Sequence, residues 1–145
     1  YEEVQFTQMY LEIEKFRFRD KFEFSLEIEE GLKNITIPKM TIQPFVENAC
    51  KHGLQASKNI GRVWIRVYSM RNQVHIIVRD NGVGMDKDKV HQIIHEEVPG
   101  HIGVQNVIQR LKLHYQDGHE FTIQSSKGEG TTVHIIIPKE EEEIE

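Results

Sequence analysis

The sequence lacks several features that mark particular classes of protein. Its 145 residues include one cysteine, Cys50, which excludes an internal disulfide framework and fits a reducing compartment. We find no apolar run near the ~20 residues that span a bilayer, and no pattern of a signal peptide. Basic residues do not prevail, because 18 Lys and Arg stand against 23 Asp and Glu, so nucleic acid is not the expected partner. Since the chain does not begin with Met, we expect a segment of a longer protein.

The length and the hydrophobic fraction of 38% predict one globular domain. We expect this domain to cover residues 1–138, with an N-terminal helix at 1–19, and the acidic residues 139–145 to be a disordered tail. Hydrophobic spacing predicts further helices over 43–52 and over 104–115. Residues 86–99 are polar and weakly patterned, which favours a mobile lid loop.

Alternating apolar and polar residues predict five strands, at 22–28, 62–68, 73–79, 121–125 and 131–137. Hairpins beside helical crossovers imply a mixed sheet. The alternation also indicates that one face of the sheet is less covered than the other. We therefore expect an α/β (α+β) fold: a two-layer sandwich of a mixed five-stranded sheet with about three helices on one face.

Polar residues gather on one face of the helix predicted at 43–52. Glu47 and Lys51 are four residues apart, and so are Asn48 and His52, so the four cluster. An amide oxygen beside a carboxylate is a plausible ligand for a hard cation. An ordinary salt bridge with an incidental Asn is the alternative at this point.

A second cluster, Asp80-Asn81-Gly82-Val83-Gly84, directly follows a predicted strand. A carboxylate at a strand end can accept a hydrogen bond from an exocyclic amine. Gly82 and Gly84 would let a flat ring approach the backbone, because no Cβ intervenes. A plain Asp-Asn-Gly turn is the alternative, although that turn does not need the second glycine.

Two glycine loops follow. The segment Gly100-His101-Ile102-Gly103 precedes a predicted helix, whose free N–H groups could meet a phosphate. It matches neither the P-loop nor the dinucleotide fingerprint. The segment Gly128-Glu129-Gly130-Thr131 lies between the last two strands, where a tight hairpin turn explains it fully when it is taken by itself.

In this order, the four segments resemble the N box and the three glycine boxes of the GHKL ATPase superfamily, which has the Bergerat ATP-binding fold. A narrower resemblance is to LytS/YesM-like bacterial sensor histidine kinases. Three stretches carry it: Leu11-Glu12-Ile13-Glu14-Lys15-Phe16-Arg17-Phe18, the run from Ile37 to Gly53, and Gly103-Val104-Gln105-Asn106-Val107 with Arg110-Leu111.

The resemblance implies a role for each matching position. Asn48 matches the Mg²⁺ ligand, and Glu47 matches the carboxylate that polarises the nucleophile or its water. Lys51 and His52 match residues that lie near the phosphates. Asp80 matches the acid that reads adenine, and Thr131 the threonine near that ring. The remaining positions expected at the nucleotide are Gly82, Gly84, Met85, Gly100, His101, Ile102 and Gly103.

The resemblance also implies a catalytic and ATP-binding domain that transfers the γ-phosphoryl of Mg-ATP to a histidine. That histidine would lie on a dimerisation and phosphoacceptor domain, because no histidine here has the Pro-His-Phe context of the family. A response regulator would follow downstream. The implied whole protein is a homodimer in the bacterial inner membrane, with this domain in the cytoplasm.

Two other functions stay open at this stage. One is an ATPase of the same superfamily in which Glu47 activates water. The other is a nucleotide-regulated interaction module without kinase activity. A zinc site at His91 and His95 is disfavoured, because no His-Glu-x-x-His order or cysteine partner accompanies them.

Overall fold

The computed structural model describes residues 2–18, 22–32, 42–50, 60–95 and 102–139. Its helices are α1 (Glu2–Phe18), the short 3₁₀ helix η2 (Glu30–Leu32), α2 (Gln43–Asn48), α3 (Lys87–His95) and α4 (Ile102–Tyr115). Its strands are β1 (Phe22–Ile28), β2 (Gly61–Met70), β3 (Gln73–Asp80), β4 (Glu120–Ser126) and β5 (Gly130–Pro138). The five predicted strands are confirmed, each to within two residues at its ends.

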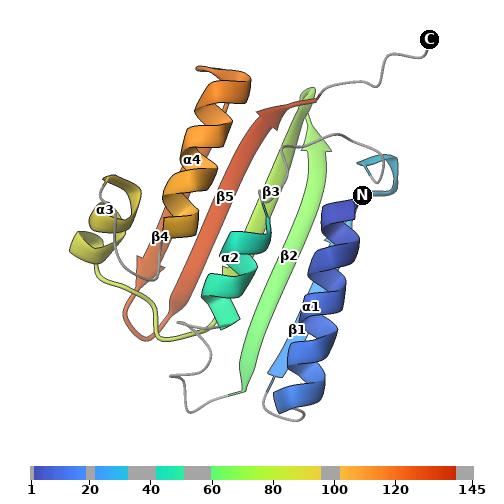
Figure 1. Ribbon diagram of the computed structural model, residues 1–145, viewed down its shortest axis with the longest axis vertical. Coiled ribbons are helices and arrows are strands. Elements are labelled where there is room, and N and C mark those ends of the chain that lie inside the picture. The colour runs from blue at the N-terminus through green and yellow to red at the C-terminus, as the bar shows by residue number, and fades with distance from the viewer. Residues whose placement is uncertain (1, 19–21, 33–41, 51–59, 96–101, 140–145) are drawn as a thin grey trace.

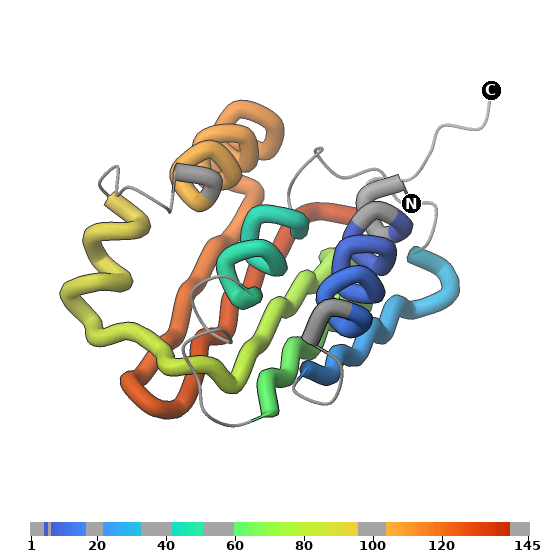
Figure 2. The backbone as a smooth tube through the Cα atoms, turned by 60° about the horizontal axis from the view of Figure 1, so that its bottom comes forward, coloured from blue at the N-terminus to red at the C-terminus, as the bar shows by residue number. Residues whose placement is uncertain are grey.

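The five strands form one sheet in the order β1-β2-β3-β5-β4. The β1–β2 pair is parallel, and the other three pairs are antiparallel. Helices α1, α2 and α4 cover one face of this sheet, and no helix of the described residues lies against the opposite face (Figure 1, Figure 2). The predicted two-layer sandwich with a mixed sheet is therefore confirmed.

The core lies between the sheet and these helices. Alternate residues of β2, β3 and β5, such as Ile65, Ile76 and Ile135, point into it and are buried. The apolar stripe of α2, formed by Phe45, Val46, Ala49 and Cys50, is buried against them, as its spacing predicted. Burial raises the pKa of the Cys50 thiol to about 12, which makes this cysteine chemically inert.

Helix α3 is the main departure from the sequence prediction. Residues 87–95 were expected to be a mobile loop, and this is wrong, because they form a helix at the β4 edge beside α4. The carboxylate of Asp86 accepts a hydrogen bond from the N–H of Lys89 (2.8 Å) and so caps the first turn. Ile93 is buried beneath this helix, and the Gln105 side-chain amide donates to its carbonyl oxygen (2.7 Å).

Helix α1 forms where it was expected, but three of its apolar residues at helical spacing face away from the sheet. Leu11 is fully buried, together with the polar residues Thr7 and Glu14 on the same face. Thr7 Oγ1 donates to the side-chain oxygen of Gln43 (2.9 Å), which joins α1 to α2. Among the apolar residues at helical spacing, Met9, Ile13 and Phe16 are 58%, 62% and 79% exposed, whereas Tyr10 is partly buried against the core.

The open face of the sheet holds one buried histidine. Although no helix of the described residues lies against this face (Figure 1), His75 is only 6% exposed. Tyr68 stacks on its ring with centroids 4.8 Å apart, and its Nδ1 lies 2.9 Å from Nε2 of His134. The neighbouring rings of Tyr68 and His134 therefore contribute to the burial of His75 on the open face.

Candidate functional site

A pocket opens between the sheet and helices α2, α3 and α4. It encloses about 540 Å³ of empty space, including the part open to solvent. Its floor comes from β3, β4 and β5, and the loop that follows β3 closes one side. The lining residues are Phe45, Asn48, Ala49, Val78, Asp80, Gly84, Met85, Ile93, Val104, Ile123, Thr131 and Val133. An apolar slot with three polar side chains, those of Asn48, Asp80 and Thr131, suits a flat ring that carries a few polar groups.

Asp80 is the charged residue of the pocket lining. It ends β3 on the core side of the sheet and is only 7% exposed. Burial raises the pKa of its carboxyl to about 6, whereas hydrogen bonds from the backbone of Gly82 and Thr131 lower it. The Gly82 N–H donates to Asp80 Oδ1 at 2.8 Å. A carboxylate held in this way accepts hydrogen bonds from a ligand N–H inside an otherwise apolar pocket.

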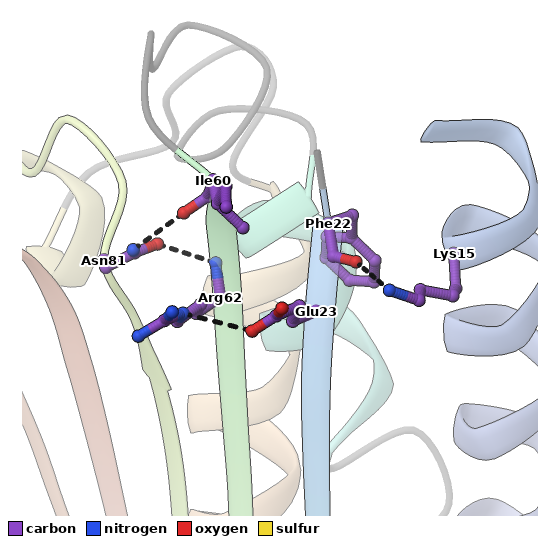
Figure 3. A network of polar contacts seen from close by, with 6 residues as sticks. All are labelled: Lys15, Phe22, Glu23, Ile60, Arg62 and Asn81. Atoms are coloured by element: carbon purple, nitrogen blue, oxygen red, sulfur yellow. Dashed lines mark hydrogen bonds and ion pairs between the residues drawn. The ribbon is translucent and has the colours of Figure 1, made fainter. Parts of the chain in front are cut away.

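Asn81 fixes the turn that follows Asp80 (Figure 3). Its side-chain oxygen accepts from the N–H of Arg62 at 2.7 Å, and its side-chain amide donates to the carbonyl oxygen of Ile60 at 3.0 Å. Arg62 in turn forms an exposed ion pair with Glu23 of β1 (3.2 Å). Asn81 therefore ties the end of β3 to the start of β2 and has a positioning role that the sequence did not reveal.

Two glycines of the predicted boxes are required for backbone packing. Gly84 has φ +69°, and a Cβ there would lie 1.9 Å from the carbonyl oxygen of Ser126. Gly130 has φ +94°, and a Cβ there would lie 2.1 Å from the carbonyl oxygen of Asp80. Gly84 was expected to let a flat ring approach the backbone, whereas its close neighbour in the structure is the β4–β5 hairpin. The glycines bring the loop, the hairpin and Asp80 together around the pocket.

Ser125, a residue that the sequence analysis did not single out, joins these segments. Its hydroxyl accepts from the N–H of Met85 at 2.7 Å and contacts Thr131 Oγ1 at 2.8 Å. It follows Ile123 at a core-facing position of β4, where a hydroxyl needs a buried partner. A polar residue at an apolar position of the alternation was the signal that could have identified it.

Helix α2 supplies Asn48, which lines the pocket, and Glu47, which does not. Both side chains are partly buried. Glu47 accepts a hydrogen bond from the side-chain amide of Gln43 (3.2 Å), one turn earlier in the helix. Asn48 lines the pocket, and the Glu47 carboxylate is next to it in sequence. This donor set fits Mg²⁺ carried by a phosphate group, because Mg²⁺ takes few ligands from the protein and keeps water and phosphate oxygens.

The structure brings five of the predicted nucleotide-binding residues into one pocket: Asn48, Asp80, Gly84, Met85 and Thr131. Gly82 lies behind Asp80 as its hydrogen-bond donor. Ile102 and Gly103 were expected in a loop, but they form the first turn of α4, next to the pocket residue Val104. Predictions for Lys51, His52, Gly100 and His101 fall outside the described residues.

A zinc site at His91 and His95 finds no support in the structure. Both side chains are exposed on α3, with ring centroids 4.4 Å apart. Within the described residues, no group of three or more His, Cys, Asp or Glu side chains is arranged to hold a metal ion. None of the helices in those ranges is both long and apolar enough to cross a membrane.

Comparison with known proteins agrees with this geometry. Residues 34–141 match the model of the family described as histidine kinase-, DNA gyrase B-, and HSP90-like ATPase. The chain is 44% identical over 110 residues to the sensor histidine kinase YpdA of Escherichia coli, covering 75% of this chain and 19% of that protein. It is 32% identical to the sensor histidine kinase YesM of Bacillus subtilis, covering 94% of this chain and 23% of that protein. It is 31% identical to the sensor protein LytS of Bacillus anthracis, covering 99% of this chain and 26% of that protein.

Solved structures show the same fold. The histidine kinase domain of the blue-light activated histidine kinase of Erythrobacter litoralis superposes with a TM-score of 0.67 at 20% identity, covering 94% of this chain and 60% of that one. The catalytic domain of the histidine kinase ThkA gives a TM-score of 0.69 at 15% identity, covering 95% of this chain and 90% of that one. The chain spans about a fifth of the length of YpdA. It spans about half of the length of another curated relative, YwpD of Bacillus subtilis. The predicted resemblance to LytS and YesM is confirmed, and the chain belongs to the family of histidine kinase-, DNA gyrase B- and HSP90-like ATPases.

Proposed function

We propose that this chain is the ATP-binding catalytic domain of a two-component sensor histidine kinase. The observation that carries this proposal is the pocket itself. Residues from α2, β3, the loop after β3 and β5, up to 88 positions apart, form one apolar slot that contains a buried carboxylate. That arrangement suits the adenine ring of ATP, whose exocyclic amine would donate to Asp80.

The phosphates would extend from the ring toward Asn48 and the first turn of α4. Asn48 would hold Mg²⁺, which neutralises phosphate oxygens when it is bound. Lys51, His52, Gly100 and His101 would meet the phosphates by resemblance to the family, and Glu47 would polarise the nucleophile. Such a domain needs little covalent chemistry, because phosphoryl transfer depends on positioning and on stabilisation of charge.

The γ-phosphoryl would pass to a histidine of a separate dimerisation and phosphoacceptor domain and then to an aspartate of a response regulator. We propose that the whole protein is a membrane-bound homodimer with this domain on the cytoplasmic side. The names of the relatives, which include sensor histidine kinases and sensor proteins, support this assignment.

Binding of Mg-ATP to the purified chain, measured by isothermal titration calorimetry, tests the first step. Asp80→Asn should weaken binding strongly, because it replaces one acceptor oxygen with an amide donor and removes the charge. Losing a buried hydrogen bond to a charged group costs about 1.5–3 kcal/mol, which corresponds to roughly 10- to 150-fold in affinity. Asp117→Asn is the matched control, since Asp117 is exposed in the turn after α4. Wild-type chain that does not bind Mg-ATP contradicts the proposal.

A second assay separates the kinase from the alternative functions. The chain is incubated with γ-labelled ATP and a helical domain that carries a histidine in a Pro-His-Phe context. Label on that histidine supports the kinase. Steady release of free phosphate that is lost in Glu47→Ala favours the ATPase. Binding without either reaction favours the interaction module.

A further inference from the structure

Ser125 connects three segments at the polar end of the pocket. Its Oγ lies 2.7 Å from the N of Met85, 3.0 Å from the carbonyl oxygen of Gly130 and 2.8 Å from Oγ1 of Thr131. Met85 belongs to the loop after β3, whereas Gly130 and Thr131 begin β5. Ser125 itself is on β4, partly buried, and contacts Thr131 from behind the lining of the pocket.

The chemistry of these partners decides where the hydroxyl protons lie. The Met85 N–H can only donate, so Ser125 Oγ accepts from it. The Gly130 carbonyl can only accept, so the single proton of Ser125 points to it. Ser125 then has no proton left for Thr131, and the contact of 2.8 Å between the two hydroxyls requires Thr131 to be the donor.

The orientation of the Thr131 hydroxyl has a consequence inside the pocket. With its proton directed at Ser125, Thr131 Oγ1 presents only lone pairs to a ligand. Hydrogen bonding from the backbone of Thr131 also lowers the pKa of the Asp80 carboxyl. Asp80 and Thr131 are direct partners across the β3–β5 ladder. The polar end of the pocket therefore offers two adjacent acceptors.

We propose that Ser125 is a positioning residue that fixes the Thr131 hydroxyl as an acceptor, so that Asp80 and Thr131 together select a 6-amino purine over a 6-oxo purine. A 6-amino group carries two N–H donors, and each acceptor takes one of them. A 6-oxo group would place a third acceptor against these two. The inference rests on the proposed function, since it presupposes that the pocket binds a purine nucleotide.

Affinities for Mg-ATP and Mg-ITP test the proposal, because these nucleotides share every group except the 6-substituent and the N1 proton that accompanies it. The variants are Ser125→Ala, Ser125→Thr and, as the matched control, Ser126→Ala, which changes the next and exposed residue of β4. The measured quantity is the ratio of the two affinities. General loosening of the pocket weakens both nucleotides and leaves this ratio unchanged.

Ser125→Ala should lower the preference for ATP over ITP by roughly threefold to tenfold, the value of one neutral hydrogen bond. The released Thr131 hydroxyl can then turn its proton to the 6-oxo oxygen. Ser125→Thr should retain the preference, because it keeps the hydroxyl, and Ser126→Ala should not change it. An unchanged or larger preference in Ser125→Ala overturns the proposal, and so does equal affinity of the wild type for both nucleotides. Wild-type chain that binds neither nucleotide would instead overturn the proposed function.

Substitutions of Thr131 give a second test that leaves Ser125 in place, in case Ser125→Ala does not fold. Thr131→Val keeps the shape and removes the hydroxyl, so it should lower the preference for ATP. Thr131→Ser can donate to Ser125 as threonine does and should retain the preference. Adding Ser125→Ala to Thr131→Val should have no further effect on the ratio. Thr131→Val with the wild-type ratio overturns the proposal.

Discussion

Gly130 approaches Asp80 so closely that a Cβ at position 130 would lie 2.1 Å from the Asp80 carbonyl oxygen. The start of β5 and the end of β3 are thus in close backbone contact beside the pocket. Gly128, two residues earlier, also has positive φ, at +82°, but a Cβ there would meet nothing within 4 Å. The two glycines therefore separate the effect of backbone conformation from the effect of the close contact.

Gly128→Ala should cost about 1–2 kcal/mol of unfolding free energy, since it places a Cβ only in an unfavourable backbone conformation. Gly130→Ala should cost distinctly more and should also abolish nucleotide binding, because the clash moves Asp80. Urea denaturation gives the two free energies, and calorimetry gives the binding. Equal costs for the two variants would contradict this prediction, because they would mean that the backbone at Asp80 moves away from the new Cβ at little cost.

Asp80 should make the stability of the chain depend on pH. Its pKa is raised from 3.8 to about 6 in the folded chain, so the folded state binds a proton more tightly than the unfolded state. The resulting stabilisation is fully present below pH 3.8 and is lost as the pH rises through about 6. At neutral pH the buried carboxylate then costs the fold up to about 3 kcal/mol relative to acid pH.

Urea denaturation of the wild type and of Asp80→Asn across pH 4–7 measures this cost. The difference in unfolding free energy between the two should shift in favour of Asp80→Asn as the pH rises, because the amide does not ionise. Asp117→Asn, at an exposed site, should show no such shift. A pH-independent difference between wild type and Asp80→Asn would mean that Asp80 titrates alike in both states.

The place of Asp80 could be predicted from the sequence because it depends on local pattern. An acidic residue that follows an alternating strand lies at the strand end, and its parity in the alternation puts it on the core side with Val78. The same reasoning located Thr131 and the five strands. The alternation also puts Ser125 on the core side, but its role could not be found in this way, because its contact with Met85 joins residues 40 positions apart.

Helices were harder to predict at two points. The α3 region is polar overall and has one fully buried side chain, Ile93, so its low hydrophobicity hid residues that have helical spacing. In α1 the apolar residues Met9, Ile13 and Phe16 have helical spacing, but tertiary contacts bury another face of the helix. The Thr7 hydrogen bond to Gln43 and the packing of Leu11 decide that orientation, and neither can be read from α1 by itself.

The orientation of α1 gives a stability test within one helix. Leu11→Ala removes a fully buried side chain and should cost about 2–5 kcal/mol of unfolding free energy. Ile13→Ala, at a position that is 62% exposed, should stay within about 0.5 kcal/mol. Chemical denaturation of both variants measures these costs. A larger cost for Ile13→Ala would mean that the apolar stripe, not Leu11, packs on the sheet.

Asn48 should make the binding of ATP depend on Mg²⁺. Asn48→Ala should remove most of the difference in ATP affinity between a magnesium buffer and one with chelator, a change of roughly tenfold, and should leave the circular dichroism spectrum unchanged. The side chain lines the pocket and is not part of the buried core. Asn106→Ala, at an exposed position of α4, is the control. Unfolding of Asn48→Ala would instead indicate a structural role.

The isolated chain should not phosphorylate itself. Transfer needs a histidine nitrogen in line with the γ-phosphate at roughly 3 Å. None of the six histidines in the described residues, at 75, 91, 95, 114, 119 and 134, lines the pocket. His52 and His101 lie outside those residues, and neither stands in the Pro-His-Phe context of a phosphoacceptor.

Incubation with γ-labelled ATP, followed by acid and by base treatment, tests this expectation, because a phosphohistidine is labile in acid and stable in base. A label with those properties on the isolated chain would contradict the prediction and point first to His101, whereas label that appears only when a phosphoacceptor domain is added fits transfer to that domain.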